Sequence, residues 1–370
     1  MELPKKRGAT WTGVRGPAIA NVTQVSEFDE VIDVRSEDEF AADRVPGSVN
    51  FPVLDNAERA RVGTLYKQAS PFEAKRVGAA LVSANIARHL QHGFFDRPRD
   101  WRPLVYCWRG GTRSAAFAHV LHQVGWRASQ LDGGYQAYRR AVVVDLAGRP
   151  RRFRWKVICG LTGAGKSRLL RALGDAGGQV LDLESLAAHR GSVLGNLPDA
   201  PQPSQKMFES QLWQALNGFD PARTVYVEAE SRKIGALRVP EALIEAMWAS
   251  ECVVLESPVA TRVGLLKQEY SHFFAQVETL NEKLEYLVPL HGHAVIDKWK
   301  ALARAASWDD LTADLLVRHY DPSYTRAIVK HYPALDRARK LELHSADDAA
   351  FAALARQCLE AEPARQRVNA

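Results

Sequence analysis

The 370-residue sequence lacks long apolar runs, internal repeats and clustered cysteines. No run approaches the ~18 to 20 apolar residues of a membrane span, and the basic start, Met1 to Arg15, has no apolar signal core. We therefore expect a cytoplasmic protein without a membrane partner. The four cysteines form no Cys-x-x-Cys pair, which argues against a zinc site and a disulfide framework.

Composition and charge are those of a globular protein with room for two cores. Hydrophobic residues make up 46% and charged residues 25% of the chain. The net charge of +6 is compatible with a polyanionic partner such as RNA but does not require one. Segment 139–156, here called the basic seam, carries seven Lys and Arg residues and one acid, Asp145. It is either an anion-facing surface or a solvated linker.

Short apolar runs alternate with helix-length segments, as in parallel sheets with crossover helices. Strands are expected at 30–34, 104–106 and near Leu131, and then at 156–159, 179–183, 224–228 and 252–256. A helix over 114–124 should end at Gly125. After Thr261 the pattern is mostly helical.

These patterns predict an α/β protein in two parts. The first is a parallel-sheet domain over 1–140, and a basic linker follows over 141–154. The second, over 155–370, is a doubly wound α/β domain with a helical C-terminal region.

A cysteine-centred loop follows the strand that ends at Tyr106 and leads into an alanine-rich helix. Backbone N–H groups, the helix N-terminus and Arg113 all favour an anion there, and this field favours the thiolate of Cys107. An isolated cysteine on a strand is more often buried and inert, but the glycine pair and Arg113 favour a nucleophile here. The predicted anion ligands are Arg109, Gly110, Gly111, Thr112 and Arg113.

A second glycine-rich loop, residues 160–167, fits the P-loop pattern G-x-x-x-x-G-K-S between an apolar strand and a helix. Its backbone N–H groups can wrap a diphosphate, Lys166 can neutralise it, and Ser167 can hold Mg²⁺. The predicted phosphate ligands are Gly160, Thr162, Gly163, Ala164, Gly165, Lys166 and Ser167.

Charged residues follow the next two strands of the P-loop domain. Acids at these strand ends face the phosphate site in such folds, where they can bind a metal through water or activate a group. Two basic residues after the third strand could hold a second phosphate or RNA, although each of these residues taken alone is equally well a surface residue. The set is Asp182, Glu184, Glu228, Glu230, Arg232 and Lys233.

The first domain resembles a rhodanese domain. The resemblance is carried by 33–35, Glu39-Phe40, 45–52 and 131–135 around the cysteine loop. It implies that Cys107 carries a transferable chalcogen. Short rhodanese loops usually place arginine five positions after the cysteine, whereas Arg113 lies six after Cys107, as in tyrosine phosphatases. The longer loop suits a phosphate-sized anion.

The pairing of both domains resembles the tRNA 2-selenouridine synthase family over roughly Val31 to Tyr332. Stretches typical of that family are 62–68, 106–111, 160–167, 189–192 and 227–235. The resemblance implies replacement of sulfur by selenium in 2-thiouridine at the tRNA wobble position (34), with selenophosphate as donor. It also implies an S-geranyl-2-thiouridine intermediate made from geranyl diphosphate.

Roles follow from the resemblance for both loops. Cys107 would be essential for selenium transfer, with the loop amides and Arg113 holding selenophosphate. Lys166 and Ser167 would hold the diphosphate of geranyl diphosphate, with Mg²⁺ as a candidate cofactor. The expected partners are a tRNA with 2-thiouridine and an enzyme that supplies selenophosphate.

Two features are candidates for RNA contact. Trp-Arg pairs begin at Trp101, Trp108 and Trp126 and could stack an extruded base, although packing in the core or at its rim is the favoured interpretation of each tryptophan. The basic seam is the stronger candidate for the anticodon stem.

Other functional classes stay open at this point. One is a Cys-x5-Arg phosphatase or a sulfurtransferase with a nucleotide-binding P-loop as regulatory domain. Another is a non-catalytic RNA-binding or signalling module with a nucleotide switch, which would bind ATP or GTP tightly and tolerate loss of Cys107. A P-loop kinase also stays open, and the lack of an arginine-rich lid between Arg232 and the last helices argues only slightly against it.

Overall fold

The computed structural model describes residues 16–192, 194–197 and 200–361. The basic start, Met1 to Arg15, lies outside them. The chain divides into two compact units, residues 1–143 and 144–370. The division falls within helix α5 (Gly134–Leu146), so the first part of the predicted linker is helical. None of the described helices is both long and apolar enough to cross a membrane.

The first unit is built on a five-stranded parallel sheet of order β1-β5-β4-β2-β3. Its strands are β1 (Ala18–Ala20), β2 (Glu30–Asp33), β3 (Val49–Asn50), β4 (Pro103–Tyr106) and β5 (Ser129–Leu131). The β4 residues Leu104, Val105 and Tyr106 are fully buried, since helices cover both faces of the sheet. A continuous apolar run is what such a central parallel strand requires.

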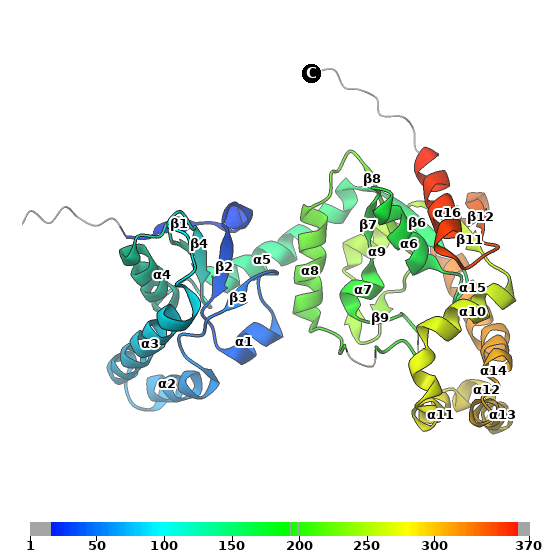
Figure 1. Ribbon diagram of the computed structural model, residues 1–370, viewed down its shortest axis with the longest axis horizontal. Helices are drawn as coiled ribbons and strands as arrows, with labels where there is room; N and C mark the ends of the chain where they lie inside the picture. The colour runs from blue at the N-terminus through cyan, green and yellow to red at the C-terminus, as the bar shows by residue number, and fades with distance from the viewer. Residues whose placement is uncertain (1–15, 193, 198–199, 362–370) are drawn as a thin grey trace, which may run out of the picture. The chain divides into compact units, whose positions relative to one another are not determined.

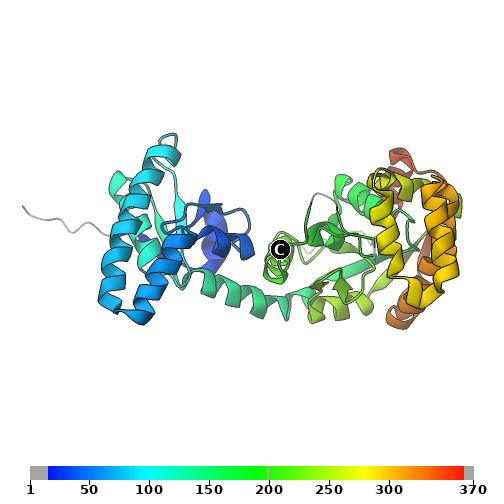
Figure 2. The ribbon, with the colours of Figure 1, turned by 90° about the horizontal axis from the view of Figure 1, so that it is seen from below.

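Helices pack on both faces of this sheet. They are α1 (Glu37–Ala42), α2 (Asn56–Gln68), α3 (Pro71–Gly93), α4 (Thr112–Val124) and α5. Figure 2 shows α2 and α3 side by side, and α3 packs next to α4 (Figure 1). As the sequence predicted, α4 ends at Gly125, which has a φ of +113°.

The second unit is built on another five-stranded parallel sheet, of order β12-β11-β6-β8-β7. Its strands are β6 (Arg154–Cys159), β7 (Gln179–Leu181), β8 (Thr224–Glu228), β11 (Glu251–Glu256) and β12 (Arg339–Glu342). The edge strand β12 was not predicted. Three of its four residues are charged, so no apolar run marks it, and only its pairing with β11 makes it a strand.

Helices cover this second sheet, and further helices gather beyond it. Around the sheet lie α6 (Lys166–Asp175), α7 (Leu183–Ala187), α8 (Gln205–Asn217), α9 (Glu241–Trp248) and α16 (Asp348–Glu360), with the small hairpin β9 (Lys233–Ile234) and β10 (Leu237–Arg238). Leu169 and Leu173 of α6 pack with Phe351 of α16 in a hydrophobic core of the second unit.

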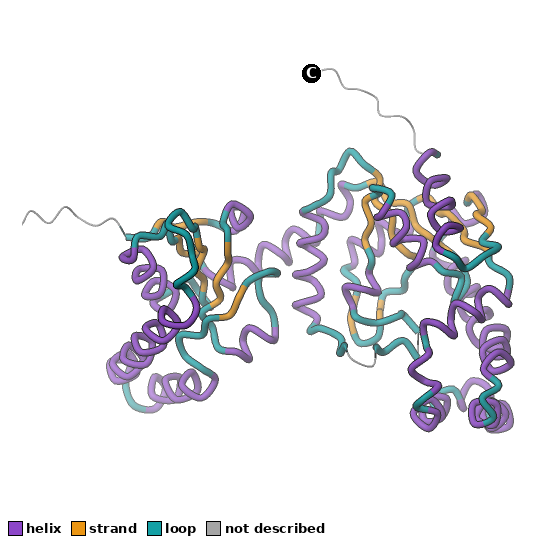
Figure 3. The backbone as a smooth tube through the Cα atoms, in the orientation of Figure 1, coloured by secondary structure: helices purple, strands orange, loops and turns teal. Residues whose placement is uncertain are grey.

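The helical part has its own core around Leu284, Trp299 and Leu315. It comprises α10 (Val259–Glu269), α11 (Val277–Glu285), α12 (Val288–His291), α13 (His293–Arg304), α14 (Trp308–Leu315), the π-helical turn η4 (Leu316–Tyr320) and α15 (Asp321–His331). Figure 3 shows α11 to α14 grouped to one side of the strands. The predicted fold class, two parallel-sheet α/β parts with a helical C-terminal region, is confirmed.

Candidate active sites

The cysteine loop joins β4 to α4 at the carboxyl end of the first sheet. Cys107 is buried, with 3% of the residue exposed. Gly110 has a φ of +65°, and a Cβ there would come within 2.7 Å of the Leu131 carbonyl oxygen, so the turn requires glycine. The Tyr135 N–H donates to the Cys107 carbonyl at 2.8 Å. The Gly-Gly-Tyr turn after β5 therefore holds the loop in place.

A chain of hydrogen bonds ends at the Cys107 sulfur. Ser114 Oγ lies 3.2 Å from both Cys107 Sγ and the Gly111 carbonyl, and Gln130 Nε2 donates to Ser114 Oγ at 2.9 Å. The Ser114 hydroxyl and the N-terminus of α4 thus both lie beside the Cys107 sulfur. Neither residue was predicted from the sequence. A serine in the first turn after the loop was a usable signal for Ser114, whereas nothing in the sequence brings Gln130 to the loop.

Arg113 is paired with an acid of the protein. Its Nη1 lies 3.1 Å from Glu39 Oε2, and both side chains are mostly buried. Glu39 comes from α1 and also lies 3.8 Å from Arg59 Nε. The predicted anion ligands share one loop, so a ligand there competes with Glu39 for Arg113. Three of the predicted ligands are exposed at the surface: Arg109, Gly111 and Thr112.

The P-loop joins β6, the central strand of the second sheet, to α6. All seven predicted phosphate ligands lie on it. Gly165 precedes α6 with a φ of +91°, and a Cβ there would come within 2.7 Å of the Phe351 ring. The backbone turn and the packing of α16 both require glycine at this position.

Two residues of the helical part, neither predicted from the sequence, form hydrogen bonds with the P-loop. The buried Arg262 donates from Nε to the Thr162 carbonyl at 2.8 Å and from Nη1 to Asp321 Oδ2 at 3.0 Å. The Gly160 N–H donates to the Tyr324 hydroxyl at 2.9 Å. The loop is therefore held by α10 and α15 as well as by its own sheet.

Lys166 is folded back onto the P-loop. Its Nζ donates to the carbonyl oxygens of Gly160 at 2.9 Å and Leu161 at 3.4 Å, and lies 5.2 Å from the centre of the Tyr324 ring. These partners are neutral, so a bound phosphate offers the ammonium group a stronger electrostatic contact.

Acids from two strand ends converge on Ser167. Its Oγ lies 3.0 Å from Glu184 Oε2 and 3.4 Å from Glu228 Oε2, and the Glu184 N–H donates to Glu228 Oε1 at 3.0 Å. Burial raises the pKa of Glu184, and it raises the pKa of the fully buried Glu228 well above its usual range. Burial and then the Glu184 charge raise the pKa of Glu230 to about 8. Protons or a cation relieve this crowding of carboxylates.

Within residues 16–192, 194–197 and 200–361, no three His, Cys, Asp or Glu side chains form a ready-made metal site. Mg²⁺ is commonly held by one or two carboxylates together with substrate phosphates and water. Ser167 with Glu184 and Glu228 fits that arrangement once a phosphate ligand supplies the remaining oxygens.

A cavity of about 420 Å³ lies over the P-loop and includes Lys166, Ser167 and Glu230 in its walls. Arg190 also lines it, with its guanidinium 4.8 Å from the centre of the Tyr270 ring. Among the described residues, Arg190 Nη1 is buried and makes no hydrogen bond. It is therefore suited to a phosphate oxygen. The stretch 189–192 was one of those typical of the family, but no role was predicted from it for Arg190.

Three other predicted residues of this unit lie elsewhere or have structural partners. Asp182 caps α7 by accepting from the Ser185 N–H at 2.8 Å, and burial raises its pKa. Arg232 is exposed and ion-paired with Glu241, and Lys233 is exposed on β9. None of the three lines the P-loop cavity.

The tryptophans do not form a single stacking surface. Trp101 is only 4% exposed and meets Trp126 edge-on, with ring centres 5.3 Å apart. The interpretation favoured from the sequence, packing in the core, is therefore confirmed for Trp101, whose ring lies in the core of the first unit. Trp108 packs against Tyr135 with ring centres 5.2 Å apart.

Several members of the basic seam have acidic partners within the second unit. Arg149 pairs with Asp145, and Arg151 Nη2 lies 2.9 Å from Glu245 Oε2. The Lys156 ammonium lies 3.9 Å from Glu251. These pairs reduce the charge that the seam presents to a polyanion.

Comparison with known proteins extends over both units. A model described as the tRNA 2-selenouridine synthase AAA domain matches residues 153–286, and one described as a rhodanese-like domain matches residues 20–141. The tRNA 2-selenouridine synthase of Aeromonas salmonicida is 31% identical over 323 residues, which cover 80% of this chain and 86% of the relative. The chain belongs to the tRNA 2-selenouridine synthase family.

Other relatives carry the same name. That of Hydrogenovibrio crunogenus is 30% identical over 349 residues, covering 85% of this chain and 95% of its own. That of Nitrosomonas europaea is 35% identical over 244 residues, and this chain spans only 63% of its length. The family resemblance noted from the cysteine loop and the P-loop is thus confirmed, and the rhodanese-like model covers the cysteine loop.

Proposed function

We propose that this chain is a tRNA 2-selenouridine synthase, an enzyme that replaces the sulfur of wobble 2-thiouridine by selenium. The observation that carries the proposal is the presence of two anion-binding loops in a member of this family. One centres on a hydrogen-bonded cysteine, and the other is a P-loop beneath a cavity of about 420 Å³. Two such loops suit a reaction with two different phosphate-containing co-substrates.

In the selenium step, the selenium of selenophosphate forms a bond to C2 of the S-geranyl-2-thiouridine while the C2–sulfur bond breaks and geranyl thiol leaves; water then cleaves the selenium–phosphorus bond and releases phosphate. Cys107, hydrogen-bonded to Ser114 at the N-terminus of α4, lies in the loop that holds selenophosphate and is essential for this transfer. Arg113 and the loop amides hold the phosphate, with Arg113 released from Glu39. An enzyme that makes selenophosphate is the expected supplier.

In the geranyl step, the P-loop holds geranyl diphosphate. The sulfur of 2-thiouridine forms a bond to C1 of the geranyl group while the C1–oxygen bond breaks and diphosphate leaves. Lys166 and Arg190 neutralise charge that develops on this leaving group. The S-geranyl group is then a better leaving group than the original sulfur when selenium replaces it.

Mg²⁺ and tRNA complete the proposal. When bound, the ion adds positive charge at the departing diphosphate, held by Ser167 with the acids behind it. A tRNA substrate implies that the protein acts in the cytoplasm. Exposed Arg109, together with the exposed Arg140 and Arg152 of the basic seam, offers positive charge to tRNA.

The test is a nucleoside assay with 2-thiouridine tRNA, given geranyl diphosphate, selenophosphate or both, and analysed by mass spectrometry. We expect wild type to form geranylated and selenated uridine. Lys166→Ala should lose geranylation, and Cys107→Ala should stop at the geranylated nucleoside. Lys340→Ala and Cys358→Ala, which lie outside both loops, are the matched controls.

The alternatives give different results in this assay. If no nucleoside changes mass in any mixture, the synthase proposal fails. Hydrolysis of a phosphate ester that depends on Cys107 would then indicate a phosphatase. If Cys107→Ala still forms selenated uridine, the cysteine has no essential part in the selenium step.

A further inference from the structure

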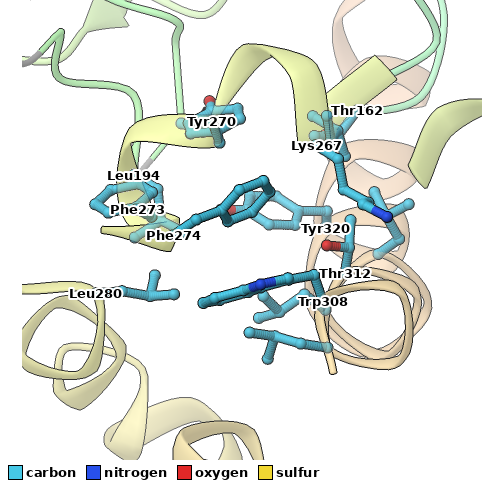
Figure 4. A pocket seen from close by; sticks show the side chains of 15 residues that line it. Thr162, Leu194, Lys267, Tyr270, Phe273, Phe274, Leu280, Trp308, Thr312 and Tyr320 are labelled. Atoms are coloured by element: carbon cyan, nitrogen blue, oxygen red, sulfur yellow. Dashed lines mark hydrogen bonds between the residues drawn. The ribbon is translucent and has the colours of Figure 1, made fainter. Parts of the chain in front are cut away.

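An apolar pocket opens in the helical part of the second unit. Its walls come from η3 (Ser271–Phe274), α10, α11, α14 and η4. Figure 4 shows the rings of Tyr270, Phe274, Tyr320 and Trp308 gathered around it with Leu280. In most helical bundles, side chains of this kind fill the core at close-packed density. Here they surround an open pocket.

The pocket adjoins the P-loop cavity. Both cavities share wall residues: Thr162, Ser192, Leu266, Tyr270 and Tyr320. Thr162 belongs to the P-loop itself. The turn η4 also faces both, with Leu316 in the wall of the apolar pocket and His319 in that of the P-loop cavity. Such π-helical turns are frequent at functional sites. A single ligand can therefore extend from the P-loop into the pocket.

The pocket has the chemistry of a hydrocarbon site. Three of its polar side chains have partners already: Lys267 pairs with Asp309 at 2.7 Å, and Ser192 Oγ lies 3.3 Å from the Tyr270 hydroxyl. A nucleobase needs polar partners along its edge, which this lining of leucine and aromatic side chains does not supply.

The size of the pocket also suits a short hydrocarbon group. Its cavity volume is about 70 Å³, on a scale where one water molecule needs roughly 10–15 Å³. It therefore has room for about five non-hydrogen atoms, the size of one isoprene unit. A purine is too large for it.

We propose that this pocket receives the distal isoprene unit of a prenyl diphosphate whose head group occupies the P-loop. The inference rests on the proposed function for the identity of the ligand. The first isoprene unit passes Tyr270 and Leu266 in the shared wall, and the second enters the pocket between Phe273 and Trp308. The helical part thus selects the length of the chain, while the P-loop binds the diphosphate.

The experiment measures calorimetric affinities of the full chain, without tRNA, for inorganic diphosphate and for its five-carbon (dimethylallyl), ten-carbon (geranyl) and fifteen-carbon (farnesyl) esters. We expect geranyl diphosphate to bind about tenfold tighter or more than the inorganic and dimethylallyl forms, because only its chain reaches the pocket. ATP should not bind as tightly as geranyl diphosphate.

Two variants change the pocket in opposite directions. Thr312→Phe adds a ring to its wall and should lower geranyl affinity about tenfold without changing that of inorganic diphosphate. Thr325→Phe, an exposed site on α15 outside both cavities, is the matched control. Trp308→Leu enlarges the pocket and should shift preference several-fold toward farnesyl diphosphate.

The proposal is overturned if geranyl and inorganic diphosphate bind equally well to wild type, or if Thr312→Phe weakens both alike. It is also overturned if ATP binds more tightly than any prenyl ester. Selective geranyl binding without modification of tRNA would leave the pocket assignment standing and sink the proposed function. Geranylation of tRNA by a chain that binds prenyl diphosphates of all lengths equally well would support the proposed function and overturn the pocket assignment.

Discussion

The two loops of this protein share one local design and differ in what surrounds it. Each joins a central parallel strand to the N-terminus of a helix through a glycine with positive φ, at Gly110 in the first unit and Gly165 in the second. At the cysteine loop, Cys107 is buried and its sulfur accepts a hydrogen bond from the Ser114 hydroxyl. The P-loop instead lies under a cavity of about 420 Å³.

The positively charged side chains of the two loops also differ in their partners. Arg113 is ion-paired with the Glu39 carboxylate, whereas Lys166 donates to the backbone carbonyls of Gly160 and Leu161 and lies over the uncharged Tyr324 ring. A phosphate displaces neutral carbonyls more easily than a mostly buried carboxylate. The cysteine loop therefore arranges its hydrogen bonds around a single sulfur atom, whereas the P-loop combines an open cavity with an ammonium group that has only neutral hydrogen-bond partners.

The largest expected effect is on the P-loop. Lys166→Met should weaken the binding of inorganic diphosphate about a hundredfold, because it removes charged hydrogen bonds to the ligand. Calorimetry measures this, and Lys340→Met on the edge strand is the control. The rate of Cys107 alkylation should not change. A loss of less than about threefold would mean that Lys166 stays on its carbonyls when ligand is bound.

A smaller effect is expected at the cysteine loop. Ser114→Ala removes the hydroxyl beside the sulfur and should slow both selenium transfer and iodoacetamide alkylation of Cys107 about tenfold at neutral pH. Geranylation should persist. Ser83→Ala, exposed on α3, serves as the control. Unchanged alkylation would show that Ser114 bonds to the Gly111 carbonyl rather than the sulfur.

The crowded acids behind the P-loop predict an effect of pH on stability. Burial raises the pKa of Glu230 from 4.5 to about 8. Between these two pH values, the Glu230 carboxyl is protonated in the folded state and ionised in the unfolded state. The associated stability is present below about pH 4.5 and is lost as pH rises through 8.

Glu230→Gln should therefore flatten the decline in the free energy of unfolding between pH 5 and 8. We expect a difference of roughly 1–2 kcal/mol, reduced from the full shift because the side chain is partly exposed. Urea denaturation across this range measures it, with Glu282→Gln as a surface control. Parallel curves for wild type and Glu230→Gln would refute the assignment.

The smallest effect concerns the pair that restrains Arg113. Glu39→Gln should raise the affinity of the cysteine loop for selenophosphate about threefold by freeing the guanidinium. Calorimetry in a Lys166→Met background isolates this loop from the P-loop, and Glu37→Gln on the same helix is the control. A lower affinity would mean that Glu39 positions Arg113 for the ligand instead of competing with it.

The sequence by itself determined both loops and most of the strands. Local chemistry explains this success: glycine at positions of positive φ, apolar runs in buried parallel strands, and Lys166 and Ser167 at the start of a helix are all written within a few consecutive residues. The same local signals carried the family resemblance.

Only the tertiary structure decided which distant side chains join each site. Gln130 of β5 contacts the cysteine loop. Arg262 and Tyr324 of the helical part form hydrogen bonds with the P-loop. Trp101 is buried in the core. The charged edge strand β12 exists only through its pairing with β11. These outcomes depend on contacts between segments far apart in sequence, and no local pattern of residues records them.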